Sequence, residues 1–199
     1  MNDTGLFLSR LALGAGIAAH GAQKAFGAFE GPGPKGAAQF MKTLGFVPGE
    51  RFARAASWTE LGSGALMVLG VGGALGPAAL ISTMVVAQTA VHAKNGFFAQ
   101  KNGVELGLMY SAGALALASA GYGKFSLDEA FGWEKLKHPW LSALALTGGV
   151  AAGLLVLSGR SAVPAETSAA PSANGPATED GRPESADRSA ADGNAALQP

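Results

Sequence analysis

Residues 5–23 read GLFLSRLALGAGIAAHGAQ, an apolar stretch of membrane-spanning length that contains Arg10 and His20. A spanning helix needs about 20 largely apolar residues. An ionisable side chain inside a bilayer is costly, so it usually faces the interior of a helix bundle and serves a function. The stretch therefore predicts a membrane protein whose helices enclose polar groups.

Four further segments have the same apolar character and complete a set of five predicted spans: residues 53–71, 77–92, 104–122 and 140–158. Glu60 lies inside the second span, His92 ends the third and Glu105 begins the fourth. We expect an all-α integral membrane protein. Its first four spans would form one bundle over residues 5–130, and residues 131–158 would add a loop and a fifth span.

The composition supports a membrane location and excludes several kinds of chemistry. Only 14% of the 199 residues are charged, against about 25% in ordinary soluble domains. The net charge is zero, and no basic tract suggests a nucleic acid partner. Cysteine is absent, which excludes disulfides and thiolate catalysis. A redox role would therefore need an external carrier such as a quinone, a flavin or a haem. No metal is expected, because no Glu-x-x-His pair of the ferritin-like kind is present.

The regions outside the spans are of three kinds. Residues 1–4 lack Lys and Arg, so the first span is not expected to be a cleaved signal peptide. Residues 37–44 repeat apolar side chains at helical spacing, which favours a short amphipathic helix in the membrane interface over a plain turn. Residues 159–199 are rich in Ala, Ser, Pro and Gly, and this composition predicts a disordered tail.

Basic residues are distributed unequally between the two predicted membrane faces. One face carries eight of them: Lys24, Lys35, Lys42, Arg51, Arg54, Lys94, Lys101 and Arg160. The other face carries three, Lys124, Lys135 and Lys137, beside several acids. Because Lys and Arg accumulate in cytoplasmic loops, the first face should be cytoplasmic. We expect a multi-pass protein of the plasma (inner) membrane, with its N-terminus outside and its tail in the cytoplasm.

An antiparallel bundle would bring six polar side chains to one pocket near the cytoplasmic face. They are His20, Lys24, Glu60, Gln88, His92 and Glu105. Glu60, His20 and His92 are the candidate catalytic residues, because carboxylates and imidazoles can move protons. Lys24, Gln88 and Glu105 are the candidate ligand-binding residues. The alternative is that these groups only join helices, at roughly 0.6 kcal/mol per hydrogen bond, or that His92 and Glu105 are solvated at the interface.

Arg10 lies apart from this pocket. It precedes Lys24 by 14 residues, which places it roughly 20 Å away along the helix, toward the outer face. A buried arginine needs a partner, and Asp128 is the nearest acid by topology after the fourth span. We therefore expect a structural ion pair between Arg10 and Asp128.

Several motifs in this order resemble the DoxX family of small bacterial membrane proteins. They are Arg10, His20-Gly21 with Lys24 and Gly27, residues 40–45, Glu60-Leu61-Gly62 with Gly70, Phe97-Phe98, Glu105, Gly121-Tyr122-Gly123 and Ser126-Leu127-Asp128. The resemblance covers about residues 5–130. It implies a four-helix membrane bundle and a role as a component of quinone-linked oxidoreductases, or of complexes that handle thiols and oxidative stress.

The chain departs from that family in two ways. The fifth span and the tail are additional, and Gly-Tyr-Gly stands at 121–123 where many relatives have Gly-Pro-Gly. The absence of cysteine also separates the chain from four-helix quinone-linked thiol oxidases, which need a dithiol pair.

Three functions remain open at this level. The first is a membrane redox component that binds a quinone head group. The second is a transporter or channel for a small polar solute, and the third is a non-catalytic scaffold for a redox partner. The expected partners are the lipid bilayer and a soluble or membrane redox enzyme, and a homo-oligomer is also open.

Overall fold

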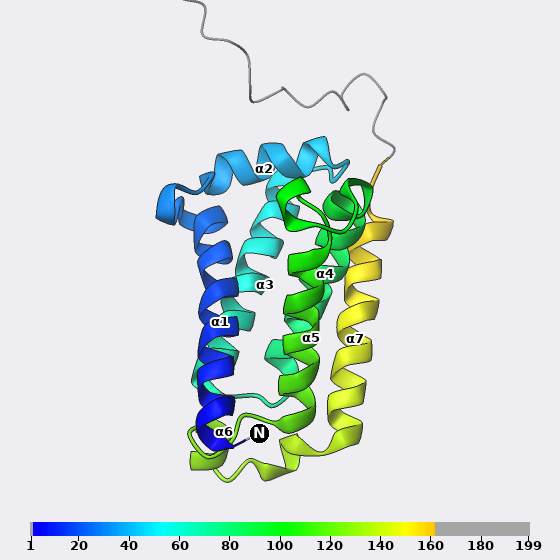
Figure 1. The fold of residues 1–199 in the computed structure, drawn as a ribbon. Coiled ribbons are helices and arrows are strands. Elements are labelled where there is room, and N and C mark those ends of the chain that lie inside the picture. Colours follow the sequence, from blue (N-terminus) through cyan, green and yellow to red (C-terminus); the bar gives the residue numbers. More distant parts are fainter. Residues whose placement is uncertain (1, 162–199) are drawn as a thin grey trace, which may run out of the picture. The chain divides into compact units, whose positions relative to one another are not determined.

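The five apolar segments form the five long helices, which run side by side in the computed structural model (Figure 1). The structure describes residues 2–161. The long helices are α1 (Asp3–Phe26), α3 (Gly49–Leu69), α4 (Leu75–Ala87), α5 (Glu105–Ala120) and α7 (Pro139–Ser158). A π-helical turn, Gln88–His92, continues α4 to the predicted end of the third span. The described residues contain helices and no strand, so the all-α prediction is confirmed.

Length and composition alone identify two of these helices as membrane spans. They are Leu75–Asn95, with a mean hydropathy of 1.3, and Pro139–Ser158, with a mean hydropathy of 1.9. Arg10 and His20 lower the hydropathy of α1, and α5 has only 16 residues. The count of five spans therefore stays a prediction.

The outward faces of the long helices carry large exposed apolar side chains. These side chains include Leu8, Leu69, Leu75, Leu106, Leu108, Met109, Leu115, Leu144, Leu154 and Leu155. Met109 is 68% exposed and Leu155 is 75% exposed. Lipid tails would cover these apolar side chains if the helices cross a membrane.

Small residues let α1 and α3 approach each other closely. A Cβ atom added at Gly64 would lie 2.4 Å from the carbonyl oxygen of Gly14, and one at Gly21 would lie 2.7 Å from the backbone nitrogen of Leu61. Such contacts are typical of membrane bundles, where close backbone packing replaces the hydrophobic driving force. The α1–α3 contact therefore requires glycine at these positions.

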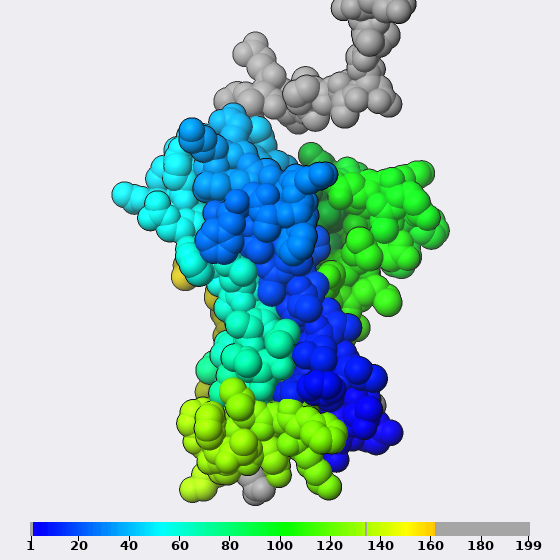
Figure 2. Space-filling model, turned by 90° about the vertical axis from the view of Figure 1, so that its left-hand side faces the viewer, coloured from blue at the N-terminus to red at the C-terminus, as the bar shows by residue number. Residues whose placement is uncertain are grey.

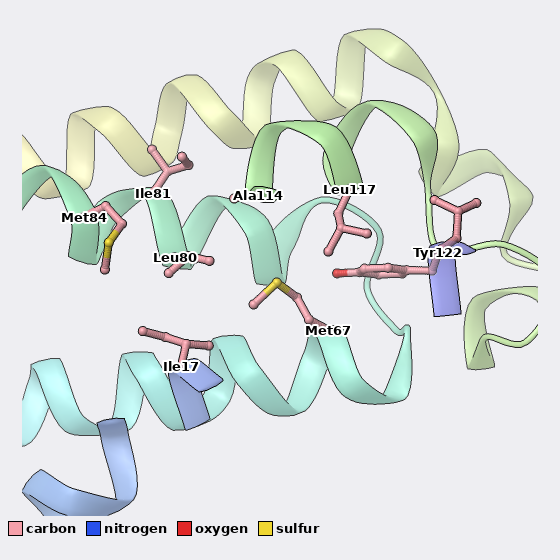
Figure 3. Close-up of a cluster of buried hydrophobic side chains, with 9 residues drawn as sticks. Ile17, Met67, Leu80, Ile81, Met84, Ala114, Leu117 and Tyr122 are labelled. Atoms are coloured by element: carbon pink, nitrogen blue, oxygen red, sulfur yellow. The ribbon is translucent and has the colours of Figure 1, made fainter. Parts of the chain in front are cut away.

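The middle of the bundle is filled by an apolar cluster from α1, α3, α4 and α5 (Figure 3). Its buried members include Ile17, Met67, Leu80, Ile81, Met84, Ala114 and Leu117. α7 packs along α4, where Gly149 brings it against the backbone of Ala78. The fifth long helix thus lies directly against α4 and also contacts α5.

The two ends of the bundle are built differently. At one end α2 (Gly33–Thr43) lies across the ends of the long helices and packs Ala37, Ala38 and Met41 on Ala53 (Figure 1). At the other end lie the N-terminus of α1 and the short helix α6 (Leu127–Ala130). The helix predicted over 37–44 is therefore present, beginning four residues earlier.

The residues directly after α7 contact the segment that follows α2. Arg160 donates a hydrogen bond from Nε to the carbonyl oxygen of Leu44 over 2.8 Å, and the backbone nitrogen of Ser161 donates to Gly45 over 2.8 Å. The predicted disordered tail, apart from residues 159–161, lies outside the described residues.

Candidate functional site

Lys24 and Glu60 form an ion pair between α1 and α3. The Nζ atom of Lys24 lies 2.5 Å from Oε1 of Glu60. The Glu60 side chain is 7% exposed and that of Lys24 is 30% exposed, so the pair is anchored in the protein but open on the lysine side. Oε2 of Glu60 is buried and has no hydrogen-bond partner in the structure. The close approach of α1 and α3 at Gly21, one turn before Lys24, makes this pair possible.

A cavity of about 560 Å³ lies beside this pair. Lys24, Glu60 and His92 contribute its ionisable groups. Most of its wall is apolar and comes from the segment around α2, from α3, and from α4 with its π-helical turn, and α7 adds Val156. The large apolar side chains of the wall include Phe40, Met41, Leu44, Phe46, Phe52 and Val86. The cavity therefore combines charged groups with an extended apolar surface, as a site for an amphipathic small molecule requires.

His92 is oriented by a backbone contact at the end of the π-helical turn. Its Nδ1 lies 2.8 Å from the carbonyl oxygen of Asn102. A carbonyl oxygen only accepts hydrogen bonds, so Nδ1 carries the proton. In the neutral ring Nε2 is then the acceptor, and it is the nitrogen that can take up a further proton.

His20, the other predicted catalytic histidine, does not line this cavity. It is exposed on α1, and its ring meets Tyr110 of α5 edge to face, with ring centroids 6.3 Å apart. The proposed convergence of all six polar side chains on one pocket is therefore wrong for His20. Sequence spacing placed His20 at the correct depth, but its direction around α1 faces α5.

Gln88 and Glu105 also do not line the cavity. Gln88 donates from Nε2 to the carbonyl oxygen of Val104 over 2.9 Å, and Glu105 accepts a 2.8 Å hydrogen bond from the backbone nitrogen of Ala99. Both side chains thus hold the segment between the π-helical turn and α5. The structure brings Lys24, Glu60 and His92 together and gives these two residues contacts with the backbone.

The apolar wall of the cavity is the part that sequence reasoning missed. Phe40, Met41 and Leu44 belong to the apolar repeat that predicted an interfacial helix, and they instead face the cavity in part. Phe46, which follows them, is fully buried. The repeat was the available signal, but it does not show which surface the helix covers.

The predicted ion pair between Arg10 and Asp128 is wrong as a direct contact. The two side chains form no salt bridge within 4.0 Å. Arg10 donates from Nη2 to the carbonyl oxygen of Phe125. Asp128 accepts hydrogen bonds from the backbone nitrogens of Gly72 and Gly73, each over 2.8 Å. Two backbone N–H groups of the glycine turn between α3 and α4 therefore occupy the carboxylate.

Arg10 is held by its surroundings at this end of the bundle. It is 2% exposed, and its guanidinium carbon lies 5.2 Å from the centre of the Phe7 ring. Gly70 makes room for it, because a Cβ atom there would overlap Nη1. Its contact with Phe125 joins α1 to the connection before α6, which indicates a structural role.

Among residues 2–161 no three His, Asp or Glu side chains lie together as a metal site would require. The candidate site is thus the cavity with its Lys24–Glu60 pair and His92.

The comparison with known families matches the DoxX family model to residues 5–93. No curated protein and no solved structure matches the chain. The matched residues run from α1 to the end of the π-helical turn and include Lys24, Glu60 and His92. The quoted motifs from Phe97 onward lie beyond the match. Residues 5–93 thus match the DoxX family model, and this match, together with the two apolar helices of spanning length, supports a membrane protein.

Proposed function

We propose that the protein is a component of a quinone-linked membrane oxidoreductase and that the cavity of about 560 Å³ binds the quinone head group. The observation that carries this proposal is the Lys24–Glu60 pair in the lining of a largely apolar cavity, where Oε2 of Glu60 is buried without a hydrogen-bond partner. A buried carboxylate oxygen without a partner is unfavourable unless a ligand or a proton satisfies it.

The residues present fit the chemistry of a quinone. Its polar oxygens need hydrogen-bond donors, and its ring and tail need apolar surface. The ammonium of Lys24 is a donor at the charged wall, and Phe40, Phe46 and Phe52 supply apolar surface. The volume also falls within the range of about 300–1,000 Å³ that is usual for small-molecule sites.

The chain's own groups can handle protons at this site. A bound quinone would accept electrons together with protons, and the chain has no cysteine to supply the electrons itself. Lys24 binds Oε1 of Glu60, while Oε2 is buried without a hydrogen-bond partner. His92 can take up a proton at Nε2. Electrons would come from a partner enzyme, so the chain would act as one subunit of a redox complex.

The apolar cluster in the middle of the bundle favours binding over transport. Glu60 and Arg10 lie toward opposite ends, and Ile17, Leu80 and Ala114 pack between these levels. All three are at most 1% exposed. A polar solute crossing the bundle would have to pass this cluster, and we therefore rank the transporter below the quinone-binding function.

The experiment measures binding of decylubiquinone to the purified full chain in detergent, by equilibrium titration and by thermal shift. We expect Glu60→Gln and Lys24→Gln each to weaken binding by roughly tenfold or more, because each removes a charged hydrogen-bonding group. Glu129→Gln is the matched control. It breaks another 2.5 Å lysine–glutamate pair, with Lys137, at the far end of the bundle, and it should leave binding unchanged.

Other outcomes would reject the proposal. Equal binding by the wild type and by Glu60→Gln would show that Glu60 only packs helices. No quinone binding together with solute-specific uptake in proteoliposomes would favour the transporter. Loss of a partner enzyme from the membrane on deletion, with neither binding nor uptake, would favour the scaffold.

A further inference from the structure

A second cavity lies where α1, α2 and α3 meet. Its volume is about 380 Å³, and Figure 2 views the molecule from the side on which these three helices come together. Four basic side chains line it: Lys24, Lys35, Lys42 and Arg54. Glu50 is the acidic residue in the lining. The three helices thus direct an excess of positive charge into one cavity.

Two of these cations have no acidic partner. Lys42 pairs with Glu50 over 2.5 Å and lowers the pKa of that carboxyl, and Lys24 pairs with Glu60. Within residues 2–161, Lys35 and Arg54 have no carboxylate within 4.0 Å. These two side chains are therefore free to bind an anion.

The start of α2 adds to the positive potential. The helix begins at Gly33 without a side-chain N-cap, and Pro34 and Lys35 of its first turn line the cavity. The unpaired N–H groups of a helix N-terminus favour a nearby anion. The backbone N–H groups of α2 and the basic side chains therefore both make the cavity favourable for an anion.

Aromatic side chains mark the mouth of this cavity. Phe26 is 65% exposed and Trp58 is 58% exposed, and their rings meet edge to face with centroids 6.0 Å apart. Both residues line the cavity. Exposed tryptophan beside basic residues is typical of the depth at which lipid headgroups lie.

We propose that this cavity binds the phosphate group of an anionic phospholipid. Lys35 and Arg54 bind the phosphate, and the planar guanidinium of Arg54 can bind two of its oxygens. Phe26 and Trp58 contact the glycerol and upper acyl region. A free phosphate carries the same charge but has no apolar part that could contact Phe26 and Trp58, so the lipid fits the cavity better.

The experiment compares short-chain phosphatidylglycerol, short-chain phosphatidylcholine and inorganic phosphate as ligands of the purified full chain in neutral detergent. Native mass spectrometry counts bound lipid, and a titration gives the affinity. We expect wild-type protein to prefer phosphatidylglycerol. The Lys35→Gln/Arg54→Gln double variant should lose roughly thirtyfold in that affinity, from about 1 kcal/mol per basic residue.

The matched control is the Lys94→Gln/Lys101→Gln double variant. It removes two exposed cations that do not line either cavity, and it should bind as the wild type does. An equal loss in both variants would mean diffuse surface charge and would overturn the proposal. Equal affinity for both lipids, or inorganic phosphate binding as tightly as phosphatidylglycerol, would also overturn it. If the double variant does not fold, Lys35→Gln alone, at an exposed position, should still weaken binding and gives the same test.

Discussion

Asp128 shows how much one buried carboxylate can stabilise. It is 1% exposed and accepts hydrogen bonds from two adjacent backbone N–H groups of the turn between α3 and α4. Hydrogen bonds to a charged group contribute about 1.5–3 kcal/mol each. Asp128 therefore fixes this turn against α6.

We expect Asp128→Ala to lower the free energy of unfolding by about 3 kcal/mol, since it leaves two backbone N–H groups without an acceptor. The measurement is unfolding of the purified protein in detergent. Glu129→Ala is the neighbouring control, because its ion pair with Lys137 is partly exposed and should contribute at most about 1 kcal/mol. Similar losses in the two variants would contradict the role assigned to Asp128.

For single residues, the sequence predicted the grouping of Lys24 with Glu60 better than it predicted the partners of Arg10 and Asp128. Lys24 and Glu60 could be assigned to one site because Lys24 follows the end of the first predicted span and Glu60 lies near the start of the second. In an antiparallel bundle these two positions lie at the same end. Asp128 could not be matched correctly, because its partners are backbone N–H groups of Gly72 and Gly73, which no side-chain pattern reveals. Arg10 likewise binds a carbonyl oxygen of a connection whose path the sequence does not show.

At the scale of elements, the α1–α3 contact depends on the absence of side chains. Gly64 faces α1, where a Cβ atom would lie 2.6 Å from Cβ of Ala18, whereas Gly62 on the same helix has nothing within 4 Å of an added Cβ. An alanine substitution at Gly64 therefore tests helix packing, and the same substitution at Gly62 tests helix propensity alone.

We expect Gly64→Ala to destabilise the protein by about 1–3 kcal/mol through overpacking. Gly62→Ala should instead stabilise it by up to about 1 kcal/mol, because alanine is the better helix former. Thermal unfolding in the same detergent measures both. A loss at Gly62 equal to that at Gly64 would show that the contact with α1 is not what matters. Gly64→Ala should also weaken quinone binding, since it separates Lys24 from Glu60.

Helix positions followed from the apolar pattern, and details of their ends did not. The predicted span 104–122 corresponds to α5, which ends at Ala120 because Gly121 adopts a positive φ of 74°. The third predicted span ends in a π-helical turn, a change of hydrogen bonding that periodicity cannot detect. α6 has only four residues, too few to produce a repeat.

At the scale of the whole molecule, the described residues divide into two unlike ends. The α2 end carries the candidate cavities and most of the basic residues, and the other end carries α6 and its acids. Because basic residues accumulate on the cytoplasmic side, the cavities should face the cytoplasm. A redox partner in the cytoplasm would then reach the site directly.

Topology reporters test this orientation and the number of spans. With five spans, a reporter fused after Pro199 should be active only as a cytoplasmic fusion, and one inserted near Glu129 only as a periplasmic fusion. A fusion after Ser158 should agree with that at Pro199. Activity of a periplasmic reporter at Pro199 would reverse the orientation, and the same location for Glu129 and Pro199 would exclude an odd number of crossings between them.

Lys24 lines both cavities, so the two proposed binding events would be thermodynamically linked through this shared ammonium. An anion that draws the Lys24 side chain toward the basic cavity withdraws it from Glu60, and a ligand beside Glu60 does the reverse. Coupling between two binding sites is reciprocal, so each occupant would weaken the other by the same factor. The affinity of the protein for its redox ligand would then depend on the content of anionic lipid in the membrane.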